Sequence, residues 1–167
     1  GRSLNGSPYT RASGFGAAIH HTGAGAVTLS NLLVTDNAAG GFGGAVNNNA
    51  SGAISIQTST ISRNTTQGSS FGGGINNNWT GSISIADSVV SENTAAGWRG
   101  GVNNNWTGTI GITGSELSDN NATGWGGGIN NNSGGSVTVA LSFVNGNSAQ
   151  NGGGINNNST GTLTTTQ

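Results

Sequence analysis

Apolar residues recur along this chain in a pattern that repeats about every 27 residues. Within each repeat, two apolar residues flank one small residue, as in Ile54-Ser55-Ile56. This alternation places both apolar side chains on one face of a short strand, so it predicts strands and not helices. Six copies align into four apolar columns at constant offsets of eight, two and five residues. The first column contains Ile19, Val46, Ile75, Val102, Ile129 and Ile155.

A single repeat of this length cannot close a hydrophobic core, so the repeats must stack on one another. Like residues then lie above like residues, and each strand pairs in parallel with the equivalent strand of the next repeat. The pattern predicts an all-β, right-handed parallel β-helix (a solenoid) of about six coils of 26–29 residues, with three short strands per coil. Every length difference falls between the fourth column and the next first column, so we expect one variable turn.

We interpret the whole chain, 1–167, as one β-helix domain. It comprises a partial N-terminal coil (1–14), full coils (15–151) and a partial C-terminal coil (152–167).

An asparagine stands three residues after the fourth column in every coil. Asparagine tolerates the left-handed backbone conformation, and stacked amides can hydrogen-bond from coil to coil. We therefore predict an asparagine ladder at a turn, and we assign the separate Asn-Asn-Asn triplets to another corner. The ladder consists of Asn37, Asn64, Asn93, Asn120 and Asn147.

Aromatic residues stand four residues before the first column. Stacked rings could form a platform for carbohydrate, but self-stacking or packing against a neighbouring molecule is the interpretation that we favour. Trp79 and Trp106 form a second, smaller pair after two of the triplets. The predicted aromatic ladder consists of Phe15, Phe42, Phe71, Trp98 and Trp125.

Two motifs carry a family resemblance: the Gly-Gly-x-Ile motif that ends at Ile75, and the apolar-x-x-Asn motif from Val90 to Asn93. Together they resemble the repeats of chlamydial polymorphic membrane proteins and of bacterial autotransporter passengers, over Phe15 to Gln167. The resemblance implies a β-helix surface protein. That group includes adhesins, surface-layer components and some polysaccharide lyases, so it does not imply one activity.

Composition narrows the function further. Charged residues make up 5% of the chain, the only cations are four arginines, and the formal net charge is -1. Such a surface cannot neutralise phosphates, which argues against nucleic acid or an anionic membrane as a partner. No apolar run is long enough to span a membrane, and the chain lacks cysteine. It begins at Gly1 without a signal-like segment, and we expect a processed extracellular or cell-surface protein.

Candidate chemistry is sparse. Asp36, Arg63, Glu92 and Asp119 precede successive ladder asparagines, so they should form one row along the axis. Glu92 above Asp119 is a candidate Ca²⁺ site or carboxylate pair. We favour a solvated row in which Arg63 bridges Asp36 and Glu92, because a lyase would also need a base near Asp119.

We therefore expect no catalytic residue, metal or cofactor. His20 and His21 point to opposite faces of a strand, so we interpret them as substitutes for the asparagine corner. Asn-x-Ser/Thr motifs offer glycosylation acceptors at Asn49, Asn78, Asn105 and Asn121.

The two ends of the chain suggest a polymer. Leu4 and Ser7 imitate the apolar-x-x-Asn spacing, while the last coil ends after Ile155, Leu163 and Thr165. These half-coils are complementary, so we expect head-to-tail stacking of subunits; the competing interpretation is a fragment of a longer surface protein. Exposed apolar residues beside the fourth column indicate lateral contacts through Leu33, Val89 and Phe143.

We expect an extracellular structural protein, the subunit of a self-stacking filament or surface layer. The alternatives are an adhesin, a glycan- or ice-binding module, and a piece of an autotransporter passenger. A polysaccharide lyase is the least favoured, and we do not expect an enzyme.

Overall fold

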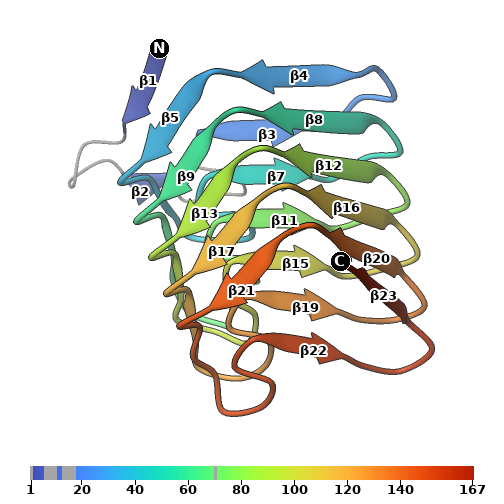
Figure 1. Ribbon diagram of the computed structural model, residues 1–167. Helices are drawn as coiled ribbons and strands as arrows, with labels where there is room; N and C mark the ends of the chain where they lie inside the picture. The colour runs from blue at the N-terminus through green and yellow to red at the C-terminus, as the bar shows by residue number, and fades with distance from the viewer. Residues whose placement is uncertain (1, 6–10, 13–17, 70) are drawn as a thin grey trace.

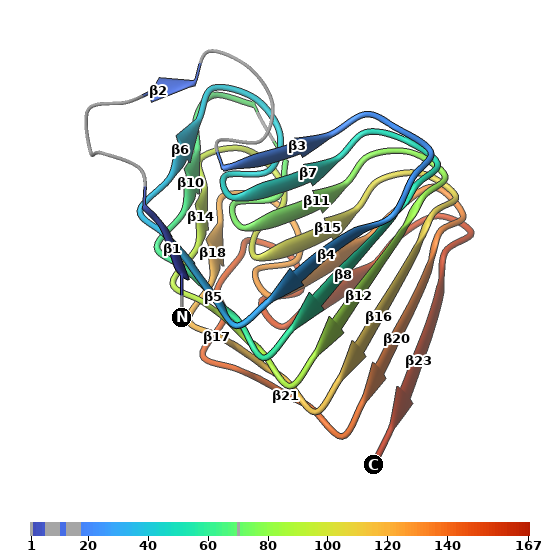
Figure 2. The same cartoon turned by 90° about the horizontal axis from the view of Figure 1, so that it is seen from above.

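The computed structural model describes residues 2–5, 11–12, 18–69 and 71–167. In these residues the chain winds through about five turns of a parallel β-solenoid, as its repeat predicts. In the described part of the chain, the coils contribute strands to four parallel sheets, which we name A to D; sheet B has five strands and the others have six, because the last coil adds no strand to sheet B (Figures 1 and 2). The layers stack from the N-terminal coil at the top of Figure 1 to the C-terminal coil at the bottom.

Sheet A contains β1 (Arg2–Asn5), β5 (Leu32–Thr35), β9 (Thr60–Ser62), β13 (Val89–Ser91), β17 (Glu116–Ser118) and β21 (Phe143–Asn145). Sheet B contains β2 (Arg11–Ala12), β6 (Ala38–Ala39), β10 (Thr65–Thr66), β14 (Thr94–Ala95) and β18 (Asn121–Ala122). Sheet C contains β3 (Ile19–His21), β7 (Val46–Asn48), β11 (Ile75–Asn77), β15 (Val102–Asn104), β19 (Ile129–Asn131) and β22 (Ile155–Asn157). Sheet D contains β4 (Val27–Ser30), β8 (Ala53–Gln57), β12 (Ser82–Ala86), β16 (Thr109–Thr113), β20 (Ser136–Ala140) and β23 (Thr162–Thr166).

The strand register places like residues on like residues. In sheet D, Ile83 of β12 pairs with Ile54 of β8 and Ile110 of β16. All three side chains are buried and point into the solenoid. The four apolar columns therefore line one continuous core, which is the arrangement that the sequence predicts.

Sheet B is an addition to the three strands per coil that the sequence predicts. Its strands are two residues long and carry small side chains such as Ala39, Thr66 and Ala95, which are buried. Two residues cannot display the alternation that identifies a strand, so the apolar pattern gives no signal here.

At three of the four corners, most coils turn on a residue with positive φ. Between sheets A and B these residues are Asp36, Arg63, Glu92, Asp119 and Gly146, with φ between 54° and 62°. The asparagines of the ladder come directly after them. Our assignment of the left-handed conformation to the asparagine itself is therefore wrong by one residue: the preceding residue makes the turn, and the asparagine follows it with its side chain inward.

The N-terminal segment extends two sheets. Leu4 of β1 pairs with Val34, in the fourth apolar column, as its spacing predicts, and β2 pairs with β6. Ser7, the other residue of this motif, lies outside the described residues. The described residues include no helix long and apolar enough to cross a membrane.

Candidate functional site

The corner between sheets A and B is held by a buried ladder of side-chain amides. Nδ2 of Asn93 donates to Oδ1 of Asn120, one coil below, and to the backbone oxygen of Ile61, both at 2.9 Å. Oδ1 of Asn93 accepts from the backbone N and from Nδ2 of Asn64, at 3.0 and 2.9 Å. The same contacts run from Asn37 to Asn147. The predicted coil-to-coil hydrogen bonds are present, and every amide-to-amide bond of this ladder runs from Nδ2 in the earlier coil to Oδ1 in the later coil.

The asparagine triplets do more than form a corner, because their first two residues lie in sheet C and, in every triplet but the last, are buried. Nδ2 of Asn76 donates 2.7 Å to Oδ1 of Asn47 in the preceding coil. Nδ2 of Asn77 donates 3.0 Å in the opposite direction, to Asn104 in the following coil. A Cβ on Gly81 would lie 2.5 Å from Nδ2 of Asn48, so the glycine at this corner leaves room for the amides.

His20 and His21 take the places of two asparagines, as interpreted from the sequence. They pair in register with Asn47 and Asn48. Nδ2 of Asn47 donates to Nδ1 of His20 at 3.0 Å. Nε2 of His21 lies 2.9 Å from the oxygen of Gly25, four residues on, just as Nδ2 of Asn48 contacts Gly52.

A serine ladder, which the apolar pattern does not predict, lies at the corner between sheets D and A. Oγ of Ser88 donates 2.6 Å to the oxygen of Ala86 and accepts 3.1 Å from the backbone N of Ser59. Ser59, Ser115 and Ser142 repeat these contacts. The signal was a serine two residues before the fourth column, hidden among the many serines of this chain.

The variable turn between sheets B and C carries the aromatic residues. Phe42 and Phe71 stack with ring centroids 5.0 Å apart, and Trp98 and Trp125 lie 4.5 Å apart with a tilt of 44°. Phe15 lies outside the described residues. The described rings thus form two pairs instead of the continuous ladder that we predict.

Arg99 separates the two pairs. Its backbone bridges to Phe71 on one side and to Trp125 on the other, in the place that Trp98 should occupy. Its guanidinium carbon lies 4.1 Å from the centroid of the Phe71 ring, and Nη1 donates to Oδ1 of Asn105. The backbone also differs at this position: the aligned residue Gly72 has φ of 68°, whereas Arg99 does not have a positive φ.

Arg99 is a charged side chain in an otherwise neutral interior. It is 8% exposed, and Nε has no hydrogen-bond partner within the described part of the chain. Burial lowers the pKa of Arg99 to about 10, because the charged form loses its hydration. In the sequence, Arg99 stands out because it directly follows an aromatic residue, a position that glycine occupies after Phe42, Phe71 and Trp125.

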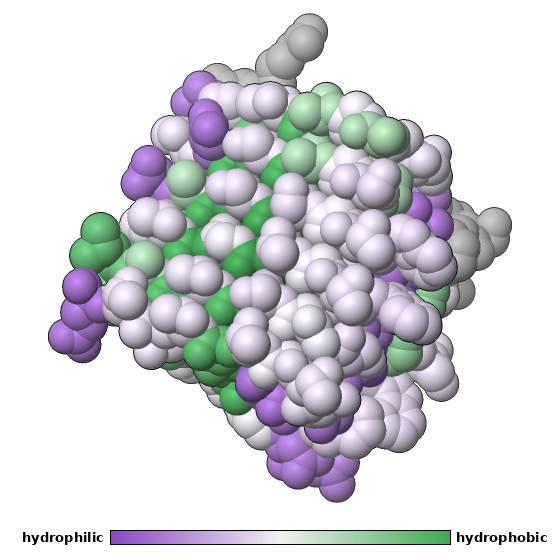
Figure 3. All heavy atoms as spheres, turned by 90° about the vertical axis from the view of Figure 1, so that its right-hand side faces the viewer, coloured by the Kyte–Doolittle hydropathy of each residue, from purple (hydrophilic) through white to green (hydrophobic). Residues whose placement is uncertain are grey.

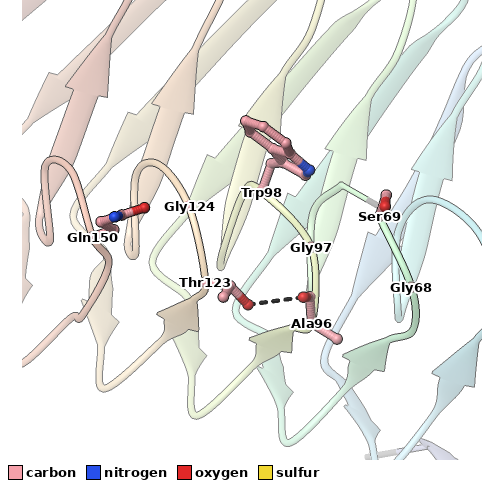
Figure 4. A pocket seen from close by; sticks show the side chains of 8 residues that line it. All are labelled: Gly68, Ser69, Ala96, Gly97, Trp98, Thr123, Gly124 and Gln150. Atoms are coloured by element: carbon pink, nitrogen blue, oxygen red, sulfur yellow. Dashed lines mark hydrogen bonds between the residues drawn. The ribbon is translucent and has the colours of Figure 1, made fainter.

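Beside Trp98 the variable turn is hollowed (Figure 4). The hollow has a volume of about 390 Å³. Small residues form much of its wall, and the side chains of Ser69, Trp98, Thr123 and Gln150 border it. Among the described residues that line it, none is charged. This is a neutral, concave site with one half-exposed indole ring.

The charged row lies on the solvent side of the A–B corner. Arg63 donates from Nε and Nη2 to the carboxylate of Asp36 at 2.9 and 3.0 Å. These hydrogen bonds lower the pKa of Asp36. Among the described residues this is the one salt bridge, so Arg63 does not bridge to Glu92 as we interpreted. Glu92 and Asp119 are exposed, and the described chain holds no cluster of three or more potential metal ligands.

Exposed apolar side chains gather at the D–A corner. Phe143 is 73% exposed and Leu141 is 67% exposed, with Leu141 at a φ of 49°. With Val89, they line a shallow groove that also contains the carboxylates of Asp87 and Glu116. Leu33, at the other end of the same row, is also exposed. On the side where sheet C turns into sheet D, the surface is mostly of intermediate hydropathy (Figure 3).

The acceptor asparagines differ in accessibility. Asn49 and Asn121 are exposed. Asn78 and Asn105 are partly buried, and their Nδ2 atoms already donate along a further amide ladder, formed by the third residues of the triplets, at 2.9 Å each. Trp79 and Trp106, which follow them, are half-exposed, with ring centroids 5.7 Å apart.

These features define a class of protein: a parallel β-solenoid whose repeated polar and apolar residues form ladders along its axis. Comparison with family models, with curated proteins and with solved structures gives no match to this chain. The resemblance to chlamydial and autotransporter repeats therefore has support at the level of the β-helix fold alone.

Proposed function

We propose that this chain is an extracellular structural protein in which the coils of one copy stack on the coils of the next. The observation that carries this proposal is the equivalence of the coils. From one coil to the next, the four sheets keep the same register, and the amide and serine ladders keep the same hydrogen bonds. The surface that the last coil of one copy presents along the axis is therefore complementary to the surface that the first coil of another copy presents.

The ladders also give the stacking a direction. In the A–B ladder, each amide-to-amide hydrogen bond runs from Nδ2 in the earlier coil to Oδ1 in the later coil. Parallel strand pairing imposes the same polarity. Two copies can continue these ladders head to tail but not head to head, which gives a heterologous contact that grows into a fibre. Each coil would add about 4.8 Å to its length.

The surface composition supports an extracellular location. The chain has no cysteine, its cations are all arginine, and charged residues are 5% of the total. Small uncharged side chains such as Ser84 and Thr138 cover the outer face of sheet D. The polymorphic membrane protein and autotransporter resemblance belongs to this proposal, since those proteins are displayed at bacterial surfaces.

The test uses two neighbouring residues of β23. Thr165 belongs to the third apolar column and pairs with Val139, whereas Thr164 pairs with Thr138 on the outer face. Thr165→Lys would place a charge against an incoming coil, and Thr164→Lys would place the same charge beside it. We expect negative-stain microscopy and sedimentation velocity to show concentration-dependent fibres for the wild type and for Thr164→Lys, but not for Thr165→Lys.

Circular dichroism of both variants checks that each retains the β-solenoid. Discrete monomers of the wild type across the concentration series would overturn the proposal. Fibres that persist in Thr165→Lys would overturn the head-to-tail contact.

A further inference from the structure

The hollow beside Trp98 is built by the irregular lengths of the variable turn. The longest of these turns, after β10, supplies Gly68 and Ser69, and the shortest, in the last coil, supplies Gln150. Trp98 and Thr123 come from the two coils between them. In Figure 4, Trp98 lies between Gln150 on one side and Ser69 on the other. The hollow therefore runs along the solenoid axis across four consecutive coils.

The indole of Trp98 is presented to solvent and held in place. It is 45% exposed, although large aromatic side chains normally bury most of their surface. Its ring contacts the ring of Trp125, with a centroid distance of 4.5 Å, which restricts its motion. A fixed, exposed aromatic face offers apolar contact area at a small cost in side-chain entropy.

The remaining border is polar and neutral. Ser69 and Gln150 are exposed and offer a hydroxyl and an amide, while Oγ1 of Thr123 donates 2.8 Å to the oxygen of Ala96. Among the described lining residues there is no carboxylate, guanidinium or imidazole. The chemistry matches a ligand with an apolar face and neutral hydroxyls at its edge, which describes a pyranose ring.

The spacing matches a chain of such rings. The first and fourth of these coils are separated by three rises of about 4.8 Å, which place the ends of the hollow about 14 Å apart, and one rise is close to the length of one pyranose unit. Glycines 68, 97 and 124 and Ala96 keep the floor free of long side chains. The hollow thus accommodates about three linked sugar units lying along the axis.

We propose that this hollow binds a neutral, unbranched oligosaccharide, with Trp98 stacking on the central sugar and with Ser69 and Gln150 contacting the flanking sugars. The site lies on the side of the solenoid and leaves both coil faces free. It is therefore independent of the stacking proposed above, and either proposal can fail without the other.

Isothermal titration calorimetry tests the site with cellohexaose, laminarihexaose, mannohexaose and chitohexaose, and with hexagalacturonate as an acidic comparator. We expect at least one neutral hexasaccharide to bind and hexagalacturonate not to bind. For the oligosaccharide that binds, the affinity should rise from the mono- to the trisaccharide and then level off. Trp98→Ala should weaken binding about tenfold or more, the effect of removing a central interface residue worth over 1.4 kcal/mol.

Trp106→Ala is the matched control, because Trp106 is also half-exposed and paired with a second indole. It should change the affinity less than about twofold, as for residues outside an interface. Ala96→Leu fills the hollow while leaving Trp98 in place, and it should also weaken binding. Failure of all four neutral probes, binding of hexagalacturonate alone, or a loss of affinity in Trp106→Ala without one in Trp98→Ala would overturn the proposal.

Discussion

The A–B corner and the variable turn between sheets B and C illustrate two ways of stacking the same coils. At the A–B corner, each asparagine is fixed by hydrogen bonds to neighbouring coils, and it always stands three residues after the fourth apolar column. At the variable turn, the aromatic side chains stack in pairs, and the spacing from the fourth column to the next first column ranges from 11 to 14 residues.

The difference shows where this fold tolerates change. A hydrogen bond weakens steeply with distance and angle, so a ladder of amides excludes insertions. Aromatic packing accepts offset and tilted arrangements, so the same register admits Arg99 between Phe71 and Trp125. Differences in length between coils are confined to the B–C turn, which contains the hollow beside Trp98.

Removing one rung of the amide ladder should have the largest effect. Asn93→Ala leaves the backbone oxygen of Ile61 and two donors of Asn64 without their partner in a fully buried corner. Each such loss costs about 1–3 kcal/mol, so we expect the free energy of unfolding to fall by about 4 kcal/mol. Urea unfolding followed by circular dichroism measures it.

Asn121→Ala is the control for that variant, because Asn121 is exposed and lies next to a ladder residue of the following coil. Its effect should stay within about 0.5 kcal/mol, as for other surface substitutions. Equal destabilisation by the two changes would contradict the view that the ladder holds the corner.

The next largest effect on stability comes from substitutions at one aligned position, which is Gly72 in the third coil and Arg99 in the fourth. Gly72 has φ of 68°, and a Cβ there would lie 2.6 Å from the oxygen of Ile75. Gly72→Ala should therefore destabilise the protein by about 2–3 kcal/mol. At the aligned position, Arg99→Gly removes a buried charge together with its contacts to Phe71 and Asn105, and these terms nearly cancel.

Thermal unfolding of the two variants, side by side, provides the measurement. The midpoint should fall clearly for Gly72→Ala and change little for Arg99→Gly. A larger loss in Arg99→Gly would mean that Arg99 holds the turn together, and not merely that the turn accommodates it.

Much of the fold follows from the sequence because the apolar columns are long-range and periodic. Side-chain alternation at Ile54 and Ile56 identifies a strand, and constant offsets identify the parallel register. The structural features that the sequence did not predict have weaker sequence patterns. Two-residue strands such as Thr65–Thr66 are too short to show alternation, and the serine ladder through Ser88 is hidden by composition.

The candidate site was less predictable than the fold. The aromatic column identified the correct turn, but nothing in the spacing shows that Arg99 would displace Trp98 from the stack. Gly72 has a positive φ at the aligned position and Arg99 does not, whereas Arg63 does have one at another corner, so residue type alone does not determine the exchange. The hollow itself depends on how turns of unequal length fold over one another, which is a property of packing and not of periodicity.

The smallest effect concerns the exposed side of the A–B corner. The hydrogen bonds from Arg63 lower the pKa of Asp36 in the folded state. Their stabilisation is therefore present above the unfolded-state pKa of 3.8 and is lost as the pH falls through the lower, folded-state pKa.

Arg63→Ala keeps a Cβ at this positive-φ position and removes only the ion pair. We expect its urea midpoint to lie slightly below that of the wild type at pH 5 and to converge with it near pH 2. Because both side chains are largely in solvent, salt should shrink the difference at pH 5. A gap that survives both acid and salt would show that Arg63 stabilises the corner through packing, which would make even this outer row part of the ladder and not a solvated edge beside it.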